Sequence, residues 1–574
     1  MFNPSTSLRL AVLLLLASPL PAAELPGFRR SPWFDEQVRE GWVSDGVRVR
    51  MTAARDYDPK RPTRLVIYAT PNGNSIEQTL GCGKADGLDW HFDIQHVAAQ
   101  VRTLRALTPT ENVVLACTEA EGLSWPAWKK KQTDGPARIR EVVEAVRGWL
   151  PMGEVRITLA GHSGGGSFLF GYLDGGEAVP AEVERFVFLD ANYSYSDDDK
   201  HGDKLLAWLK GDKTRRLVVI AYDDRDITLD GKRVVGPDGG TFRATERMRK
   251  RFEKDVTLTE TTGDDFVHRV GLNGQLALHV HTNPKVKILH TALVGEMNGL
   301  LRGLTDDWPK PAWGAFGGPR AYAKWVQPAP GIPKRPADAV GGKAFFAKLD
   351  GMKPKEREAA IADEIARGNV PDFLRTFHQL KVPAKDAKGK EHTAVLEVMP
   401  DYLAVGSDTD FVRVPMTPMT AAYIAERFGC ALPTRKIADD VYQAATVKLE
   451  PKPLTTDRET VATFLKHHEV IEGQREGKKL GELVAGIKKD VVVSNRLTEK
   501  ANRVAIYGWH KTDGTPIQPL TVVHVNTYVD YSHGVRLVKR AVTVDGRERD
   551  LRHILVSPDL SPLVSDEGPI TAGY

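Results

Sequence analysis

The sequence predicts an α/β fold, with a mostly parallel sheet that has helices on both faces, followed by a separate α+β region. From about residue 63, short apolar and β-branched segments alternate with helical patterns, as is typical of strands buried on both faces. The strand candidates are 64–70, 112–118, 154–160, 185–191 and 216–222, and the clearest helix candidates are 134–150 and 241–254. At 574 residues, 41% of them hydrophobic and 27% charged, the chain has a globular composition and is long enough for roughly two to four domains.

The N-terminus has the pattern of an export signal. Arg9 precedes the apolar run "LAVLLLLASPLPAA", which ends in small residues. The run is shorter than the roughly 20 apolar residues that a membrane span needs. We therefore expect residues 1–23 to be a signal peptide cleaved near Ala22 or Ala23, an uncleaved anchor being the alternative. The mature protein is expected to be secreted or periplasmic and to have no membrane span.

Charge and cysteine content exclude several classes of partner. The formal net charge is +4, and like charges never run for more than a few residues, so no nucleic-acid partner is indicated. The three cysteines are Cys82, Cys117 and Cys430, and no C-x-x-C spacing occurs, so neither a zinc cluster nor any other cofactor is predicted. An oxidising compartment permits a disulfide, and Cys82 could pair with Cys117.

The chain divides into three parts after the signal peptide. Residues 24–305 are predicted to form the sheet-containing domain. Residues 306–340 are rich in proline and tryptophan, which indicates an extended linker held on a domain surface by its aromatic side chains. Residues 341–574 are predicted to form the α+β domain. Its helix candidates are 353–368 and 419–430, and its strand candidates are 392–407, 503–510, 521–532 and 533–544.

A glycine-rich turn joins the strand candidate 154–160 to a helix-like segment. The turn reads Gly161-His162-Ser163-Gly164-Gly165, which fits G-x-S-x-G. A serine on such a turn has its hydroxyl exposed at the carboxyl end of the sheet, and larger flanking side chains would collide with the strand and helix. Ser163 is therefore the candidate nucleophile, a purely structural glycine turn being the alternative. His162 is expected to be a spacer that points away from Ser163.

With this turn in its strand–helix context, residues 60–305 resemble the α/β-hydrolases. The resemblance implies an oxyanion hole, an acid and a histidine, in the chain order serine, acid, histidine. The implied oxyanion loop is Pro71-Asn72-Gly73-Asn74, where the family often has a His-Gly pair. Backbone N–H groups of Gly164 and of Gly73 or Asn74 would stabilise the oxyanion. An ordinary Asn-Gly turn is the alternative.

The acid and the histidine are chosen by their positions after strand candidates. Asp226 follows the strand 216–222 and is favoured as the acid, and Asp190, after the preceding strand, is its rival. His290 follows the strand-like 285–289 and precedes a helix-like segment, where the resemblance implies the catalytic histidine. The spacing from Asp226 to His290 is longer than is usual in the family, so an insertion is expected between them. The weaker histidine candidates are His268, His279 and His281.

A second cluster of polar residues lies near the C-terminus. It contains His510, His524, Asp530 and His533. Histidines with a carboxylate can hold zinc with an open position, although this spacing matches no common metal signature. A polar strand face with ordinary hydrogen bonds is the alternative, because period-2 alternation would put His524 and Asp530 on one face of a strand over 521–532.

The leading hypothesis is an exported serine hydrolase that cleaves an ester of a small molecule or a polymer, a carbohydrate- or cell-envelope-linked ester being one candidate. The loop aromatics that could grip such a substrate or form a lid are Trp90, Trp125, Trp128, Tyr193 and Tyr195. One alternative is a degenerate hydrolase scaffold whose C-terminal domain is a metal-dependent hydrolase or a polymer-binding module. A binding module would expose Tyr507, Trp509, Tyr528 and Tyr531. A serine peptidase is a further alternative, because peptidases share the triad.

Overall fold

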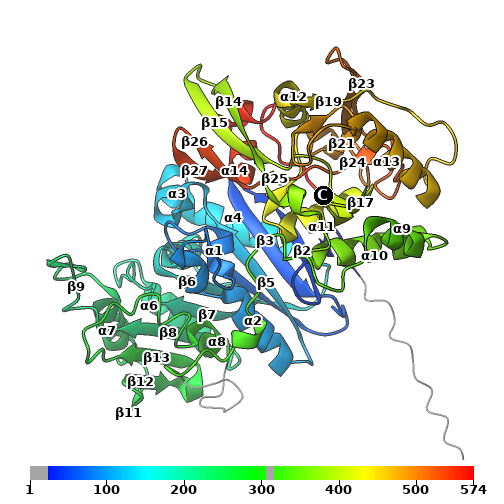
Figure 1. Cartoon of the computed structure of the whole chain (residues 1–574). Helices are drawn as coiled ribbons and strands as arrows, with labels where there is room; N and C mark the ends of the chain where they lie inside the picture. Colours follow the sequence, from blue (N-terminus) through cyan, green and yellow to red (C-terminus); the bar gives the residue numbers. More distant parts are fainter. Residues whose placement is uncertain (1–23, 45, 306–315) are drawn as a thin grey trace, which may run out of the picture.

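The computed structural model describes residues 24–44, 46–305 and 316–574. The predicted signal peptide and the first ten residues of the predicted linker lie outside this part of the chain. Figure 1 shows one large sheet in the N-terminal half (residues 24–305) and several smaller sheets in the C-terminal half (residues 341–574). Among the described residues, no helix is both long enough and apolar enough to cross a bilayer.

The large sheet has eleven strands in the order β1-β2-β3-β5-β4-β6-β7-β8-β13-β12-β11. Its six central strands are parallel: β5 (Asn112–Glu119), β4 (Thr63–Ala69), β6 (Val155–His162), β7 (Val183–Leu189), β8 (Arg216–Tyr222) and β13 (Leu276–His281). The antiparallel edges are β1 (Arg29–Arg30), β2 (Glu36–Val43), β3 (Val47–Ala54), β12 (Phe266–Gly271) and β11 (Thr259–Gly263). The predicted mostly parallel sheet and all five of its strand candidates are confirmed.

Helices cover both faces of this sheet, as the continuous apolar strands require. In β4, Leu65 and Ile67 face one hydrophobic cluster, whereas Val66 and Tyr68 face the other. The first face is covered by α3 (Trp125–Lys131), α4 (Gly135–Arg147), α5 (Gly166–Asp174), α6 (His201–Gly211) and α7 (Thr241–Phe252). The second face is covered by α1 (Ile76–Leu80), α2 (Val97–Leu107) and α8 (Gly299–Gly303).

The segment before His290 differs from the prediction. Residues 285–289 form no strand, and the last parallel strand, β13, ends nine positions before His290. His290 therefore follows a loop. The expected insertion lies between β8 and β13: a small hairpin of β9 (Thr228–Leu229) and β10 (Lys232–Arg233), then α7, β11 and β12.

Residues 316–325 of the predicted linker lie against the N-terminal half, whereas residues 331–340 contact the C-terminal half, where Arg335 donates to Asn369 at 2.9 Å. The Phe316 ring packs 4.0 Å from that of Phe266, centroid to centroid. The Tyr322 hydroxyl donates to the Gly295 carbonyl at 2.9 Å, and an Arg102 N–H donates to the Trp325 carbonyl at 3.1 Å. Phe316 and Tyr322 contact the N-terminal half through their side chains, and Trp325 does so through its backbone carbonyl.

The C-terminal half combines short antiparallel strands with helices, which confirms the α+β prediction. One sheet contains β18 (Cys430–Ala431), β25 (Val538–Lys539), β14 (His378–Lys385), β15 (Glu391–Val398), β26 (Ala541–Val544) and β27 (Arg547–Asp550). Another contains β23 (Pro516–Thr521), β22 (Ile506–His510), β21 (Lys489–Val491) and β24 (His533–Gly534), in which β21 and β24 are parallel. The helices of ten or more residues are α10 (Pro354–Ala366), α11 (Pro418–Arg427), α12 (Arg435–Ala444) and α13 (Val461–Arg475), and α9 (Gly342–Leu349) and α14 (Leu551–Val556) are shorter.

Two sequence expectations fail in the C-terminal half or at its border. Residues 522–532 form no strand, so the period-2 argument for His524 and Asp530 does not hold. The disulfide between Cys82 and Cys117 does not form either, because both are buried free cysteines, as is Cys430.

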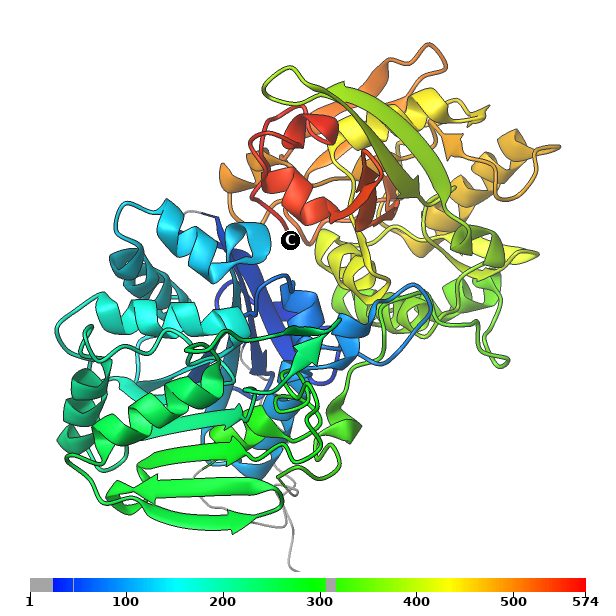
Figure 2. The same ribbon diagram turned by 90° about the vertical axis from the view of Figure 1, so that its left-hand side faces the viewer.

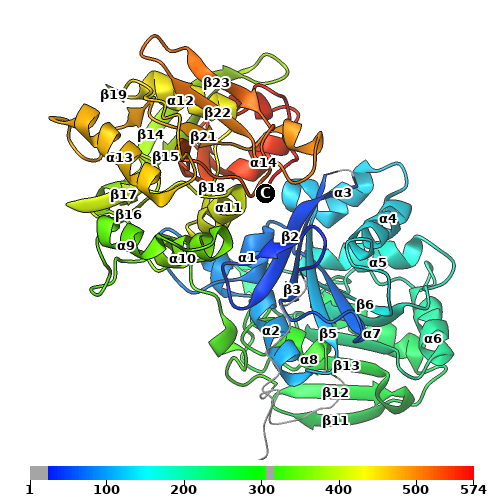
Figure 3. The same ribbon diagram turned by 90° about the vertical axis from the view of Figure 1, so that its right-hand side faces the viewer.

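The two halves meet along β2, β3 and α1. Figures 2 and 3 show α14 and α11 of the C-terminal half beside these elements. Arg29 in β1 donates to Glu426 in α11 at 2.5 Å, and Arg50 in β3 pairs with the same carboxylate. Charged side chains therefore line the contact between the halves.

Candidate active site

The turn after β6 has the geometry of a nucleophile elbow. β6 ends at His162, and a single 3-10 turn over Ser163–Gly165 leads into α5. Ser163 has φ = +52°, in the left-handed region that non-glycine residues seldom occupy. A Cβ on Gly165 would collide with the Ala69 carbonyl, and one on Gly166 with the Ala191 carbonyl. The strand ends on either side therefore require glycine here, and the turn presents Ser163 at the carboxyl edge of the sheet.

His290 is paired with a buried acid at this edge. Its Nδ1–H donates to Oδ2 of Asp190 at 2.5 Å. Asp190 follows β7, and its side chain is 1% exposed. The hydroxyl of Thr241, at the start of α7, donates to the other oxygen of Asp190. With Nδ1 held in this way, Nε2 is the nitrogen of His290 left to accept a proton.

Asp226, the acid that the sequence favoured, lies elsewhere. Its side chain is 76% exposed and pairs with Arg233 at 3.6 Å, at the small β9–β10 hairpin. The chain leaves β8 and turns outward into this hairpin, which takes Asp226 to the surface. The rival Asp190 is the carboxylate that contacts His290, so we correct the sequence-based preference.

A second carboxylate, Asp224, is buried behind the first. Its Oδ2 accepts the backbone N–H of Thr241 at 2.8 Å, while its Oδ1 has no hydrogen-bond partner. Burial, with a further contribution from the charge of Asp190, raises the pKa of Asp224 to about 6. Thr241 thus bridges the two acids, its amide bonded to Asp224 and its hydroxyl to Asp190. No local pattern predicts this bridge, because Thr241 lies 51 positions from Asp190.

His162 is more than the expected spacer. Its Nε2–H donates to the backbone carbonyl of His290 at 2.9 Å, and the two rings lie 4.4 Å apart, centroid to centroid. Burial lowers the pKa of His162 well below its ordinary value, so the ring is neutral and keeps the proton on Nε2 for this bond. The residue before the nucleophile therefore fixes the backbone of His290.

The implied oxyanion loop differs in detail from the expectation. The N–H of Gly73 already donates to the Leu123 carbonyl at 2.8 Å, and that of Asn74 to the Pro71 carbonyl at 3.3 Å. These two amides are therefore engaged within the fold. The N–H of Gly164 lies in the first turn before α5, where backbone donors have no intrahelical acceptor.

The side chain of Asn72, in the implied oxyanion loop, lies beside the elbow. Its side-chain amide lies directly against Gly164, where a Cβ would collide with it. The Asn72 amide group thus packs against the residue that follows Ser163. The departure from the family's His-Gly pair puts an amide, rather than a ring, in this position.

The N-terminal half combines three features. Its central strands are parallel, a serine lies on a left-handed turn after β6, and an acid after β7 is bonded to a histidine. This half has an α/β-hydrolase-like fold. No protein-family model matches the chain, and no curated relative matches it by sequence.

Solved α/β-hydrolase structures match the chain at low identity. A siderophore hydrolase from Aspergillus nidulans is 14% identical and covers 52% of this chain and 100% of its own, with a TM-score of 0.26. A feruloyl esterase module from Clostridium thermocellum is 10% identical, over 36% of this chain and 72% of its own, with a TM-score of 0.24. A dienelactone hydrolase-like phosphotriesterase from metagenomic libraries is 11% identical, over 51% of this chain and 94% of its own, with a TM-score of 0.26. At these values the comparisons say nothing of the reaction.

The loop aromatics separate into two groups. Trp90 is 63% exposed and Tyr193 is 40% exposed, and the Tyr193 hydroxyl lies 3.4 Å from Nδ1 of His290. Trp125, Trp128 and Tyr195 are buried in the hydrophobic cluster on the first face of the sheet. Trp90 lines a cavity of about 870 Å³ together with Glu296, six residues after His290. Only Trp90 and Tyr193, of the five aromatics proposed, are therefore available to a substrate.

The three weaker histidine candidates of the N-terminal half lie in the strands β12 and β13. Nδ1 of His268 lies 2.9 Å from Nδ1 of His279 across β12 and β13. Nδ1 of His281 accepts the Asn283 N–H at 2.9 Å. These bonds engage the three rings, and Asp190 and His290 take no part in them.

In the second predicted cluster, His524, Asp530 and His533 lie around Tyr528, but the four predicted side chains do not share a metal-binding point. His510 contacts Asp439 at 2.9 Å, whereas His524 stacks on Tyr528 with 4.3 Å between ring centroids. Asp530 accepts from Arg458 at 2.5 Å, and His533 is fully buried with neither ring nitrogen hydrogen-bonded. Within the described ranges, no three His, Cys, Asp or Glu side chains gather where a metal ion could bind. The metal-site interpretation is therefore not supported.

The binding-module interpretation also loses its basis. Tyr507, Trp509 and Tyr531 are buried, and Tyr528 alone of the four is partly exposed. Their aromatic surface belongs to the core of the C-terminal half, so it forms no platform for a polymer.

Proposed function

We propose that this protein is an exported serine hydrolase that cleaves an ester with the triad Ser163, His290 and Asp190. The observation that carries the proposal is the 2.5 Å bond between His290 and buried Asp190, at the sheet edge where Ser163 lies on a strained turn. A bonded acid and histidine beside such a serine are the parts that activate a hydroxyl nucleophile. The signal-like N-terminus supports export.

Each group has one role in the reaction. Nε2 of His290 takes the proton of the Ser163 hydroxyl as Oγ attacks the ester carbonyl, and Asp190 stabilises the resulting imidazolium. The Gly164 N–H and the Asn72 amide donate to the oxyanion of the tetrahedral intermediate. When the intermediate collapses, the ester C–O bond breaks and the leaving alcohol takes the proton from His290.

Water completes the cycle. His290 takes a proton from a water molecule that attacks the acyl-serine carbonyl. The second tetrahedral intermediate then releases the carboxylic acid and returns the proton to Ser163. No cofactor takes part in either half of this cycle.

The exposed aromatics favour a substrate with a flat apolar face. The Tyr193 ring lies 6.5 Å from that of His290, centroid to centroid, and Trp90 lines a cavity that reaches Glu296. Such rings stack on sugars or on aromatic acyl groups. A carbohydrate-linked or aromatic ester, either small or attached to a polymer, is the class that we propose.

Labelling and turnover test the proposal together. A fluorophosphonate probe should label the purified wild-type protein at Ser163, and Ser163→Ala should abolish both labelling and hydrolysis of p-nitrophenyl esters. A peptide p-nitroanilide should be cleaved at least a hundredfold more slowly than the matching ester if the enzyme is an esterase. Equal labelling of wild type and Ser163→Ala would overturn the assignment of the nucleophile.

A further inference from the structure

The oxyanion loop (residues 71–74) is continuous with α1, whose first turn is held from outside. Ile76, the first residue of α1, donates its N–H to Oε2 of Glu119 at 2.7 Å. Glu119 is the last residue of β5, and its side chain is buried. The direction in which the chain leaves the oxyanion loop therefore depends on where this carboxylate lies.

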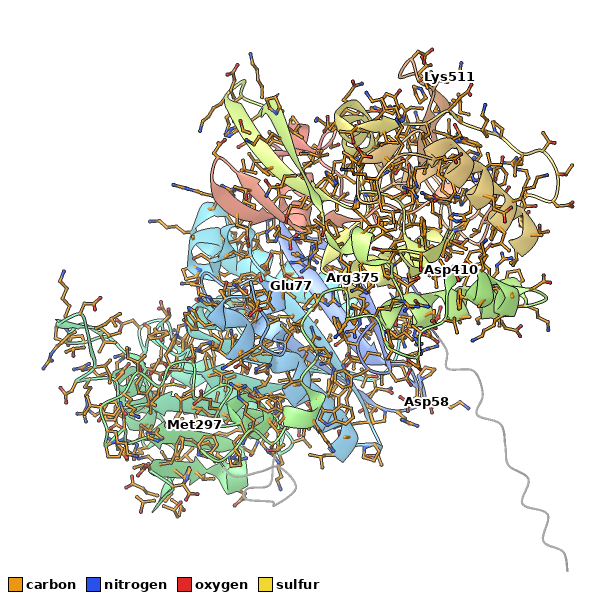
Figure 4. The ribbon with its side chains drawn as sticks, in the orientation of Figure 1. Asp58, Glu77, Met297, Arg375, Asp410 and Lys511 are labelled. Atoms are coloured by element: carbon orange, nitrogen blue, oxygen red, sulfur yellow. The ribbon has the colours of Figure 1, made fainter. Side chains whose placement is uncertain are left out.

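Two consecutive residues of the C-terminal half reach the same point. His553 in α14 contacts Oε1 of Glu119 through Nε2 at 2.8 Å. Arg552, the residue before it, donates to Oε1 of Glu77 in α1 at 2.7 Å and to Oε1 of Glu40 in β2 at 2.9 Å. Glu77 is labelled in Figure 4, at the boundary between the halves.

The charges at this contact are buried and matched. Arg48 in β3 has a side chain that is 1% exposed and donates to both Glu40 and Glu77. Burial alone would raise the pKa of Glu77, but Arg48 and Arg552 hold it well below its ordinary value. Removing one partner from such a buried set leaves an uncompensated charge, so the remaining groups must shift.

From these contacts we infer that the C-terminal half completes the active site by positioning the oxyanion loop. The chain of contacts runs from His553 to Glu119, to the Ile76 N–H and so to the loop that carries Asn72. Arg552 and His553 are positioning residues, since neither touches the nucleophile. The inference rests on the proposed function for its kinetic consequence but not for the coupling itself.

The coupling can be measured without any activity. Hydrogen exchange of the peptide 71–80 should be about tenfold faster or more in His553→Leu and in Arg552→Met than in the full-length wild type, because the hold on the first turn of α1 is weakened. His553→Gln keeps a donor and should stay near wild type. The matched control is Arg435→Met, which removes an exposed ion pair to Asp566 in the same half. Exchange of 71–80 that is unchanged in both His553→Leu and Arg552→Met would overturn the inference.

Kinetics test the consequence for the reaction. His553→Leu should lower kcat for a p-nitrophenyl ester by about 10²-fold, as expected for a misplaced oxyanion donor, with KM changed less than twofold. The fraction of protein labelled at Ser163 at completion should stay at the wild-type level, and His553→Gln should restore most of kcat. A fall in kcat that only matches a fall in labelled fraction and Tm would mean loss of folded protein and would overturn the positioning role.

Failure of the two proposals is distinguishable. Wild-type protein that neither hydrolyses esters nor reacts with the probe would refute the serine hydrolase. The rate of hydrogen exchange in residues 71–80 would still decide whether α14 positions the oxyanion loop.

Discussion

His162 donates its Nε2–H to the backbone carbonyl of His290 at 2.9 Å, and the two rings lie 4.4 Å apart. One residue precedes the nucleophile and the other is the proposed base, so a single bond fixes the distance between the elbow and the histidine loop. The base is thereby positioned from both sides, by Asp190 through its ring and by His162 through its backbone.

Replacing His162 by phenylalanine should weaken this control. The ring volume stays, but the carbonyl of His290 loses its donor, and we expect kcat to fall about tenfold and the free energy of unfolding to fall by about 1 to 2 kcal/mol. The measurements are steady-state kinetics and urea unfolding. His162→Gln retains an N–H donor and is the control. Since His162 is already neutral, the pH profile of kcat/KM should keep its shape in both variants. Loss of the fall in kcat/KM at acidic pH would contradict the neutral state of His162.

The choice of acid can be tested with two isosteric changes. Asp190→Asn should lower kcat by about 10³ to 10⁴, because the amide no longer stabilises the imidazolium or sets its tautomer. Asp226→Asn should leave kcat within about twofold of wild type, since that carboxylate lies at the surface. The opposite order of effects would restore the sequence-based preference.

Asn72 is expected to act only when charge develops on the substrate oxygen. Asn72→Ala should lower kcat by about 10²- to 10³-fold with little change in KM. Asn72→Asp keeps the shape but replaces a donor with a charge and should be at least as slow. A variant that raises KM at unchanged kcat would show that Asn72 binds the ground state instead.

Asp224 should make stability fall as the pH rises. Its pKa is raised from 3.8 to about 6, so the folded state binds the proton more tightly than the unfolded chain. The contribution of this proton to the free energy of unfolding is complete below about pH 4 and is lost as the pH rises through 6. Asp224→Asn removes it, and the variant should become more stable than wild type by about 2 kcal/mol at pH 8 but not at pH 4. Chemical denaturation across pH 4–8 measures the difference, and parallel curves would contradict the assignment.

Glu426, at the contact between the halves, should make the free energy of unfolding rise with pH, the opposite of the effect of Asp224. Burial alone would raise its pKa, but Arg29 and Arg50 lower it from 4.5 to about 2. Its contribution is present above pH 4.5 and is lost as the pH falls towards 2. Glu426→Gln should therefore cost about 3 kcal/mol at neutral pH, a penalty that shrinks on acidification. A penalty that is constant from pH 7 to pH 3 would be inconsistent with this ion pair.

The parallel sheet and the elbow could be predicted because their signals are local. Strands buried on both faces have continuous apolar runs, and the turn at Ser163 needs its glycines within five residues. β2 and β3 carry Glu40, Arg48 and Arg50 and do not read as buried strands. These charged side chains are shielded from solvent because the C-terminal half packs on them. The sequence around them contains no pattern that predicts this contact.

The site partners depended on distant parts of the chain. Asp190 and Asp226 both follow strands. What distinguishes them is that the hairpin after β8 carries Asp226 to the surface, whereas Thr241 contacts Asp190. In the C-terminal half, the apparent alternation over 521–532 was wrong. There Asp530 is held within its own turn by the amide and hydroxyl of Ser532, which needs no strand.

The bond between Arg552 and Glu40 joins positions 512 residues apart. The N-terminal half leaves the ribosome first, and domains generally fold as units in that order. Its large sheet can form while α14 is still to be synthesised, but Glu40 and Glu77 then lack Arg552. The proposed oxyanion loop would therefore reach its final position only after α14 has been made and docks against β2 and α1.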